Sequence, residues 1–181
     1  NCDDVSFTPT LVFKQLMKLK VNTSHGPDGV SANILKELAY SISNPLSLLF
    51  KLSFSTATLP DVWKTAIVSP IFKKGLSSDV ANYRPISLTC IVCKVMESII
   101  RDQVLHYLLQ NNLITKNQHG FLTRHSTCTQ LLECVNDWTL SLNDRNGVDV
   151  IYIDFSKAFD SVVHSKLLLK LESYGISGNL C

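Results

Sequence analysis

The carboxylate of Asp154 has the clearest chemical potential in this sequence, because it follows directly on a run of strand-forming residues. Residues 148–153 are rich in Val, Ile and Tyr, and the polar Ser156 and Lys157 end the run. This pattern predicts a strand that delivers Asp154 to its end, facing a cleft. A hard cation such as Mg²⁺ prefers oxygen ligands of this kind, so the position suits metal-dependent phosphoryl transfer. A second carboxylate for a metal pair must come from elsewhere.

Two cations, Arg84 and Lys73, are candidates for binding phosphate. Arg84 stands between Tyr83 and Pro85, a stiff mount that suits a guanidinium donating two hydrogen bonds to phosphate oxygens. A surface Arg paired with an acid such as Asp79 explains the same spacing equally well. Lys73 continues the alternation of a predicted strand, although solvated Lys residues are common beside polar turns.

The cysteines and histidines give a weaker signal. The chain has six Cys, and Cys90 and Cys93 have the CxxC spacing of a zinc half-site. Both lie among apolar residues and no second CxxC exists, so we interpret them as reduced, buried thiols. We assign no chemistry to four histidines without a partner at nucleophile or metal spacing: His25, His119, His125 and His164.

The composition predicts a globular chain. Of its 181 residues 45% are hydrophobic, and the net charge of +2 gives no argument for nucleic-acid binding from bulk charge. The most apolar stretch, 38–59, is interrupted by Asn44-Pro45 and Lys51, so no membrane span of about 20 apolar residues is predicted. The start at Asn1 without Met and the turn-like end lead us to expect an excerpt of a longer intracellular protein.

The first third of the chain is predicted to be helical. Thr8 can cap a helix that begins at Pro9, and Ser31 can cap a second. Asn44-Pro45 is expected to restart a third helix that ends before Leu59. Between the first two helices, the dense turn signal of residues 24–29 requires an unusual backbone path.

A β-hairpin with a long loop is expected next. Residues 65–73 read as a strand in which Pro70 indicates an edge, and residues 83–89 read as its partner. The polar residues 74–79 form the loop between them.

The rest of the chain is predicted to alternate helices with the strand before Asp154. Apolar spacing indicates a helix over 91–110 and another capped by Ser126, and both are expected to pack into a core. Asp160 is expected to cap a last helix, with Gly175 just past its end.

Several motifs then follow one another in order across almost the whole chain. They are Gly26-Pro27-Asp28-Gly29, Trp63-Lys64 through Pro70-Ile71-Phe72-Lys73, Asn82-Tyr83-Arg84-Pro85-Ile86-Ser87-Leu88, Gln118-His119-Gly120-Phe121 with Ser126-Thr127, and Asp154-Phe155-Ser156-Lys157-Ala158-Phe159-Asp160. In this order they closely resemble the reverse transcriptase of LINE-type (non-LTR) retrotransposons, in the style of jockey-like elements. The resemblance implies an α/β (α+β) right-hand polymerase fragment, with fingers and the entry to the palm in residues 1–147 and the beginning of the palm in 148–181.

The resemblance also implies roles for individual residues. Asp154 would be the catalytic residue and a metal ligand, with the carbonyl of Phe155 as a further ligand. Phe159 would lie against the sugar of the incoming nucleotide, and Lys73 and Arg84 would hold its triphosphate.

A further set of residues would lie along the template or primer by the same resemblance. They are Gly26, Asp28, Gln118, Gly120 and Phe121. The implied activity is RNA-directed DNA synthesis from a primer 3′ end with two Mg²⁺ ions. The implied partners are an RNA template, a DNA primer and deoxynucleoside triphosphates, with no membrane, and the implied place of action is the nucleus.

Two departures from the family limit these expectations. Its aromatic-x-Asp-Asp motif, which carries the other metal ligands, is absent, so we expect this chain alone to be inactive. Val163 stands where the family often has an Asp before His164. Two alternatives therefore stay open: a non-catalytic nucleic-acid-binding remnant of such an element, and a helical interaction module in which Asp154 is only a turn residue.

Overall fold

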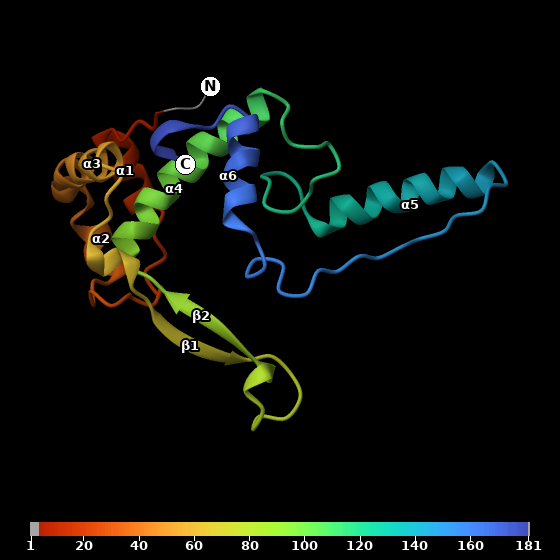
Figure 1. Cartoon of the computed structure of the whole chain (residues 1–181), viewed down its shortest axis with the longest axis horizontal. Coiled ribbons are helices and arrows are strands. Elements are labelled where there is room, and N and C mark those ends of the chain that lie inside the picture. Colours follow the sequence, from red (N-terminus) through yellow and green to blue (C-terminus); the bar gives the residue numbers. More distant parts are fainter. Residues whose placement is uncertain (1–3, 181) are drawn as a thin grey trace. The chain divides into compact units, whose positions relative to one another are not determined.

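A computed structural model describes residues 4–180, which form two units that we treat separately. The first unit comprises residues 1–107 and 175–181, and the second comprises residues 108–174. Helices dominate both, and a two-stranded antiparallel sheet is the one sheet found among the described residues (Figure 1). The chain is thus a mixed helix-and-sheet structure, as predicted.

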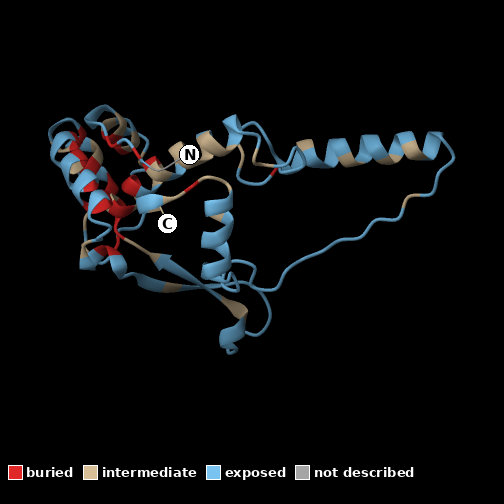
Figure 2. Cartoon of the chain, turned by 45° about the horizontal axis from the view of Figure 1, so that its top comes forward, coloured by how far each residue is buried: buried red, intermediate tan, exposed pale blue. Residues whose placement is uncertain are grey.

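The core of the first unit is built from helices α1 (Pro9–Met17), α2 (Ala32–Glu37), α3 (Ala39–Ser55) and α4 (Ile91–Gln110). Both predicted caps are confirmed: Thr8 Oγ1 accepts from Leu11 N–H at 3.2 Å, and Ser31 Oγ accepts from Ile34 N–H at 3.3 Å. Figure 2 shows the buried residues gathered in these helices.

Aromatic side chains fill much of this core. The ring of Phe7 lies edge-on to Phe50 and Phe54, with centroids 5.9 and 5.6 Å away, and Phe50 contacts Trp63 in the same manner. The side-chain amide of Gln103 on α4 exchanges two hydrogen bonds of 2.9 Å with the backbone of Ser6, so the segment before α1 is tied to α4.

The predicted helix restart at Asn44-Pro45 is wrong, because α3 begins at Ala39 and continues through Pro45. Pro45 removes one N–H donor from the helix. A continuous buried face before and after it, from Ala39 through Ser47 to Phe54, packs on α1 and keeps the segment helical. Packing has therefore overridden the local signal.

The predicted hairpin is confirmed. Strand β1 (Ile67–Phe72) pairs with β2 (Tyr83–Leu88) in antiparallel register, with Ile67 opposite Leu88 and Phe72 opposite Tyr83. A 3₁₀ turn, η1 (Asp61–Lys64), precedes β1, and a second, η2 (Val80–Asn82), precedes β2. The ribbon extends away from α1–α4, and its strands contact each other far more than any helix (Figure 1).

Two prolines lie opposite each other at the centre of the hairpin, Pro70 on β1 and Pro85 on β2. In an antiparallel ladder, hydrogen-bonded residue pairs alternate with pairs that are not hydrogen-bonded. Lys73 N–H donates to the carbonyl of Asn82 at 2.8 Å, so 73/82 is a hydrogen-bonded pair and 70/85, three positions along the ladder, is not. Backbone groups in such pairs point to the outer edges, and proline has no N–H to offer there. The central donor is thus missing from both open edges of the hairpin.

We expect these prolines to prevent edge-to-edge association of hairpins. Replacing one of them, as in Pro70→Val, opens one edge and is expected to give dimers at most. The double variant Pro70→Val/Pro85→Val opens both edges and is expected to form larger oligomers as concentration rises. Light scattering after gel filtration measures the mass, and a double variant that keeps the wild-type mass would show that the prolines do not protect the edges.

The second unit contains α5 (Thr127–Asn143) and α6 (His164–Ser173), and η3 (Gly178–Leu180) follows in the first unit. Ser126 caps α5 as predicted, in a reciprocal capping box with Thr129. Gly175 follows α6 with φ +80°, as predicted for a residue just past a helix end. The prediction that α5 packs into a core is wrong, since none of its residues is buried.

The strand predicted at 148–153 is absent. The segment is extended but unpaired and almost entirely exposed, with Ile151 84% and Tyr152 85% accessible. A strand requires a neighbouring backbone to bond with, and no described segment pairs with this one in a sheet.

Asp160 does not cap the last helix, which begins instead at His164 after Val163 in an extended conformation. Residues 156–161 form turns, with Lys157 at φ +49° and Ser161 N–H bonded to the Lys157 carbonyl. The β-branched pair Val162-Val163 precedes this helix, and such residues have a slightly lower helix propensity and a preference for extended backbone.

Candidate functional site

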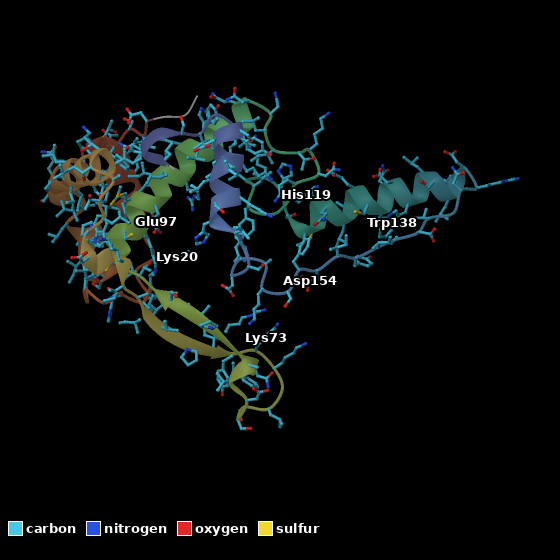
Figure 3. The ribbon with its side chains drawn as sticks, in the orientation of Figure 1. Lys20, Lys73, Glu97, His119, Trp138 and Asp154 are labelled. Carbon is cyan, nitrogen blue, oxygen red and sulfur yellow. The ribbon has the colours of Figure 1, made fainter. Side chains whose placement is uncertain are left out.

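Lys73 and Arg84 lie on the same face of the hairpin. Residues opposite each other in an antiparallel ladder point to one face, so Lys73 shares its face with Asn82, and Arg84 shares the same face with Ile71. The two cations are diagonal neighbours across the ladder, a relation in which Cα atoms lie about 7–8 Å apart. Both side chains are exposed, and Figure 3 shows Lys73 near the end of the ribbon farthest from the helices.

No acid neutralises this pair within the described residues 4–180, where neither cation forms an ion pair. Asp79 is the acid suggested as an ion-pair partner of a surface Arg84. Its carboxylate instead accepts from Ala81 N–H at 2.9 Å and caps η2. Two unpaired positive charges on one face can attract an anion such as a phosphate group.

The loop beyond Lys73 is held in place by residues of β2 and η2. The Asn82 side-chain amide donates to the Leu76 carbonyl at 3.0 Å, and the Tyr83 hydroxyl donates to the Ser77 carbonyl at 2.9 Å. Gly75 has φ +92°, and a Cβ there would lie 2.6 Å from the Asn82 side chain. The loop therefore has a defined path that fixes the backbone on which Lys73 is mounted.

The turn of residues 26–29 lies at the opposite end of the hairpin. Gly29 N–H donates to the Gly26 carbonyl at 3.1 Å, and the Asp28 carboxylate accepts from Val30 N–H at 3.2 Å. Gly26 is buried against the residues that follow β2, whereas Asp28 is half-buried.

Asp154 and Phe155 belong to the second unit and lie on the exposed, unpaired segment, where Figure 3 labels Asp154. The Asp154 carboxylate and the Phe155 carbonyl are oxygen donors of the kind that Mg²⁺ binds. The donor type fits the metal, but the number falls short: no group of three or more His, Cys, Asp and Glu side chains gathers anywhere in the described part of the chain.

Phe121 and Phe159 are brought together within the second unit. Their rings meet edge-on with centroids 6.3 Å apart, although Phe121 is 89% and Phe159 80% exposed. Phe121 has φ +64°, a rare backbone conformation for a bulky residue. Gln118 and Gly120 are also exposed, and the Gln118 amide donates to the Gly120 carbonyl at 2.8 Å.

His119, a histidine without a predicted role, is the centre of a hydrogen-bonded cluster. It is buried; its Nδ1 lies 3.1 Å from Thr129 Oγ1, and its Nε2 lies 3.1 Å from Glu133 Oε2. The His125 ring packs edge-on at 5.1 Å. The one signal in the sequence was the i, i+4 spacing of Thr129 and Glu133 on α5. The cluster anchors the segment before α5 to its first two turns.

The CxxC cysteines are free, buried thiols, as interpreted from the sequence. Burial raises the pKa of the Cys90 thiol, and burial together with Glu97 raises the pKa of Cys93 to about 12. Both thiols therefore stay protonated at neutral pH, which suits a structural role.

No helix among residues 4–180 has the length and apolarity needed to cross a lipid bilayer. Two unpaired cations on one face of a hairpin are a feature found in the broad class of proteins that bind phosphate-bearing ligands.

Comparison with known proteins narrows this class. Residues 71–180 match the family described as reverse transcriptase (RNA-dependent DNA polymerase). The chain is 28% identical over 92% of its length to the probable RNA-directed DNA polymerase from transposon X-element of Drosophila melanogaster. It is 30% identical over 86% of its length to the RNA-directed DNA polymerase from mobile element jockey of the same species.

A third relative, the retrovirus-related Pol polyprotein from type-1 retrotransposable element R1 of Bradysia coprophila, is 29% identical over 89% of this chain. The chain belongs to the reverse transcriptase family, and the predicted resemblance to non-LTR retrotransposon polymerases is confirmed. It spans 18% of the X-element polymerase, 17% of the jockey polymerase and 16% of the R1 polyprotein.

Proposed function

We propose that this chain is the nucleotide-binding part of an RNA-directed DNA polymerase of a non-LTR retrotransposon. Residues 1–147 correspond to the fingers and the entry to the palm, and 148–181 to the beginning of the palm. The enzyme adds deoxynucleotides to a primer 3′ end on an RNA template. The observation that carries this proposal is the pair Lys73 and Arg84, unneutralised within the described residues and on one face of a hairpin in a chain of this family.

The two cations hold the triphosphate of the incoming nucleotide. The Arg84 guanidinium can donate two parallel hydrogen bonds to phosphate oxygens, and Lys73 adds a point charge beside it. Because the loop beyond Lys73 is fixed by Asn82 and Tyr83, the pair is held before the ligand arrives.

Asp154 and the Phe155 carbonyl would hold Mg²⁺ together with ligands from elsewhere in the polymerase. Bound Mg²⁺ neutralises the triphosphate and activates the attacking hydroxyl in this class of reaction. Because Asp154 alone provides too few ligands, the 181-residue chain by itself does not extend a primer.

Phe159 lies against the sugar, while Gln118, Gly120 and Phe121 lie along the template or primer. Their exposure supports this assignment, because an aromatic face must be accessible in order to stack on a base. Asp28 of the turn is half-buried and still accessible to the primer or template, whereas the buried Gly26 contributes through its backbone.

The alternative of a binding remnant without catalysis has no specific observation in its favour. Action in the nucleus follows from the proposed use of a DNA primer.

Binding of a fluorescent deoxynucleoside triphosphate to the 181-residue chain tests the role of the hairpin. Arg84→Ala is expected to weaken binding by about tenfold or more, since a hydrogen bond to a charged group contributes about 1.5–3 kcal/mol. Arg84→Lys is also expected to weaken binding, because a point charge does not reproduce two parallel donors.

Lys74→Ala is the matched control, because it removes the same charge as Lys73→Ala. Lys74 lies one residue beyond the last hydrogen-bonded pair of the ladder, 73/82. It is expected to change the affinity much less than Lys73→Ala. Equal losses in both Lys variants, or an unchanged affinity in Arg84→Ala, would contradict a specific triphosphate grip.

A further inference from the structure

The backbone of Gly26 is pressed against the point where the hairpin returns to the helices. A Cβ on Gly26 would lie 2.5 Å from both the nitrogen of Cys90 and the carbonyl carbon of Thr89. These are backbone atoms between the end of β2 at Leu88 and the start of α4 at Ile91. Only a residue without a side chain allows so close an approach.

Cys90 connects this contact to the other end of the hairpin. Its thiol donates to the Val62 carbonyl at 3.3 Å, and Val62 belongs to η1, which leads into β1. The Asp28 carboxyl interacts with the same thiol. The turn 26–29 therefore contacts the end of the hairpin directly, and its start through Cys90. We call the place where Val62, Thr89 and Cys90 meet this turn the hairpin root.

Within the described residues, little else holds the hairpin against the helices of the first unit. All residues of β1 and β2 are exposed or half-exposed, and the strands contact chiefly each other. The direction of the hairpin therefore depends on the root.

We propose that the turn 26–29 sets the direction of the hairpin, with Gly26 as a positioning residue for Lys73 and Arg84. The contacts at the root support the positioning of the hairpin by Gly26. The importance of that positioning for nucleotide use rests on the proposed function. The tight turn, closed between Gly26 and Gly29, is the surface against which the hairpin root is seated.

A small movement at the root has a large effect at the cations. Six residues of strand span roughly 20 Å, so a rotation of about 10° at the root moves the far end by roughly 3 Å. A misplacement of about 1 Å can cost about a hundredfold in rate. Close backbone packing at Gly26 is a means of keeping such rotation small.

Residual dipolar couplings of the backbone amides test this in the 181-residue chain, because they report the orientation of the hairpin relative to α1 and α3. In the wild type, couplings from the hairpin and the two helices are expected to fit one alignment tensor. In Gly26→Ala, the hairpin couplings are expected to become smaller and to lose this common fit, while those of α1 and α3 still share one tensor.

Gly29→Ala is the matched control. Gly29 belongs to the same turn and has φ +66°, but a Cβ there meets nothing within 4 Å. This variant strains the turn without touching the root, and its hairpin is expected to keep the common tensor. If Gly26→Ala keeps it as well, or if both glycine variants lose it, Gly26 has no specific positioning role.

Should Gly26→Ala fail to fold, Asp28→Ala decides in its place. This variant removes the carboxylate beside Cys90, and its hairpin couplings are expected to become smaller and to lose the common fit, as in Gly26→Ala. Hairpin couplings that still fit the common tensor in Asp28→Ala would overturn the proposal. The nucleotide-binding role is judged separately by Arg84→Ala. An unchanged triphosphate affinity there would remove the proposed function while the couplings still report on the root.

Discussion

Asp154→Asn is expected to lower primer extension by at least about a hundredfold, because a metal ligand supports several kcal/mol of charge stabilisation and each 1.4 kcal/mol is about tenfold in rate. The assay needs a complete polymerase. We define the chimeric polymerase as the jockey polymerase of Drosophila melanogaster in which this chain replaces the corresponding segment. Asn preserves the shape of the side chain and removes only its charge.

Asp149→Asn in the chimeric polymerase is the matched control, since Asp149 is an exposed carboxylate of the same segment. Its loss is expected to change extension little. If the two variants are equally active, or equally impaired, Asp154 is not the specific metal ligand that we propose. Primer–template affinity, measured in parallel by fluorescence anisotropy, is expected to stay close to the wild-type value in both.

Phe159→Val is expected to raise the use of ribonucleotides relative to deoxynucleotides by roughly tenfold to a hundredfold, the range that the bulk of one side chain can provide in a pocket. A ring beside the sugar leaves room for a deoxyribose and clashes with a 2′-hydroxyl, so it rejects the wrong substrate by repulsion. Steady-state incorporation of each nucleotide by the chimeric polymerase gives the ratio.

Two further measurements distinguish this role from plain core packing. Phe159→Tyr keeps the ring and is expected to keep the discrimination. A side chain that merely filled a core would lose both activities together with thermal stability on shortening, and that parallel loss would remove Phe159 from the site. Phe159 is 80% exposed and its ring meets that of Phe121, which is 89% exposed; this exposure favours the sugar contact over core packing.

Features decided within a few residues were predictable from the sequence. The caps Thr8, Ser31 and Ser126 are each a short polar side chain that bonds an N–H three residues on, which is a local interaction. The hairpin was also predictable, because its alternation and its polar loop are local signals.

Features decided by distant packing were not predictable. Pro45 stays inside α3 because a buried face extends on both sides of it, and no local pattern reports that face. The segment 148–153 has the composition of a strand, yet no described segment pairs with it. Composition describes what a segment can form, whereas pairing depends on a partner.

The candidate site likewise has parts that the sequence could predict and parts that depend on distant packing. Sequence alternation placed Lys73 and Arg84 on opposite strands, but their common face depends on the register that the 73/82 pair reveals. The seat of Gly26 against Thr89 and Cys90 joins segments more than sixty residues apart, so no spacing rule could have shown it. His119 was overlooked because its partners lie on the following helix.

Templated primer extension by the chimeric polymerase is the most direct test that this chain is a functional part of a reverse transcriptase. With Mg²⁺, an RNA template and a DNA primer, the chimeric polymerase is expected to make DNA complementary to the template, read by sequencing the product. The unaltered jockey polymerase is the positive control for the assay. A folded chimeric polymerase that binds primer and template but makes no templated DNA, while the control does, would contradict the account.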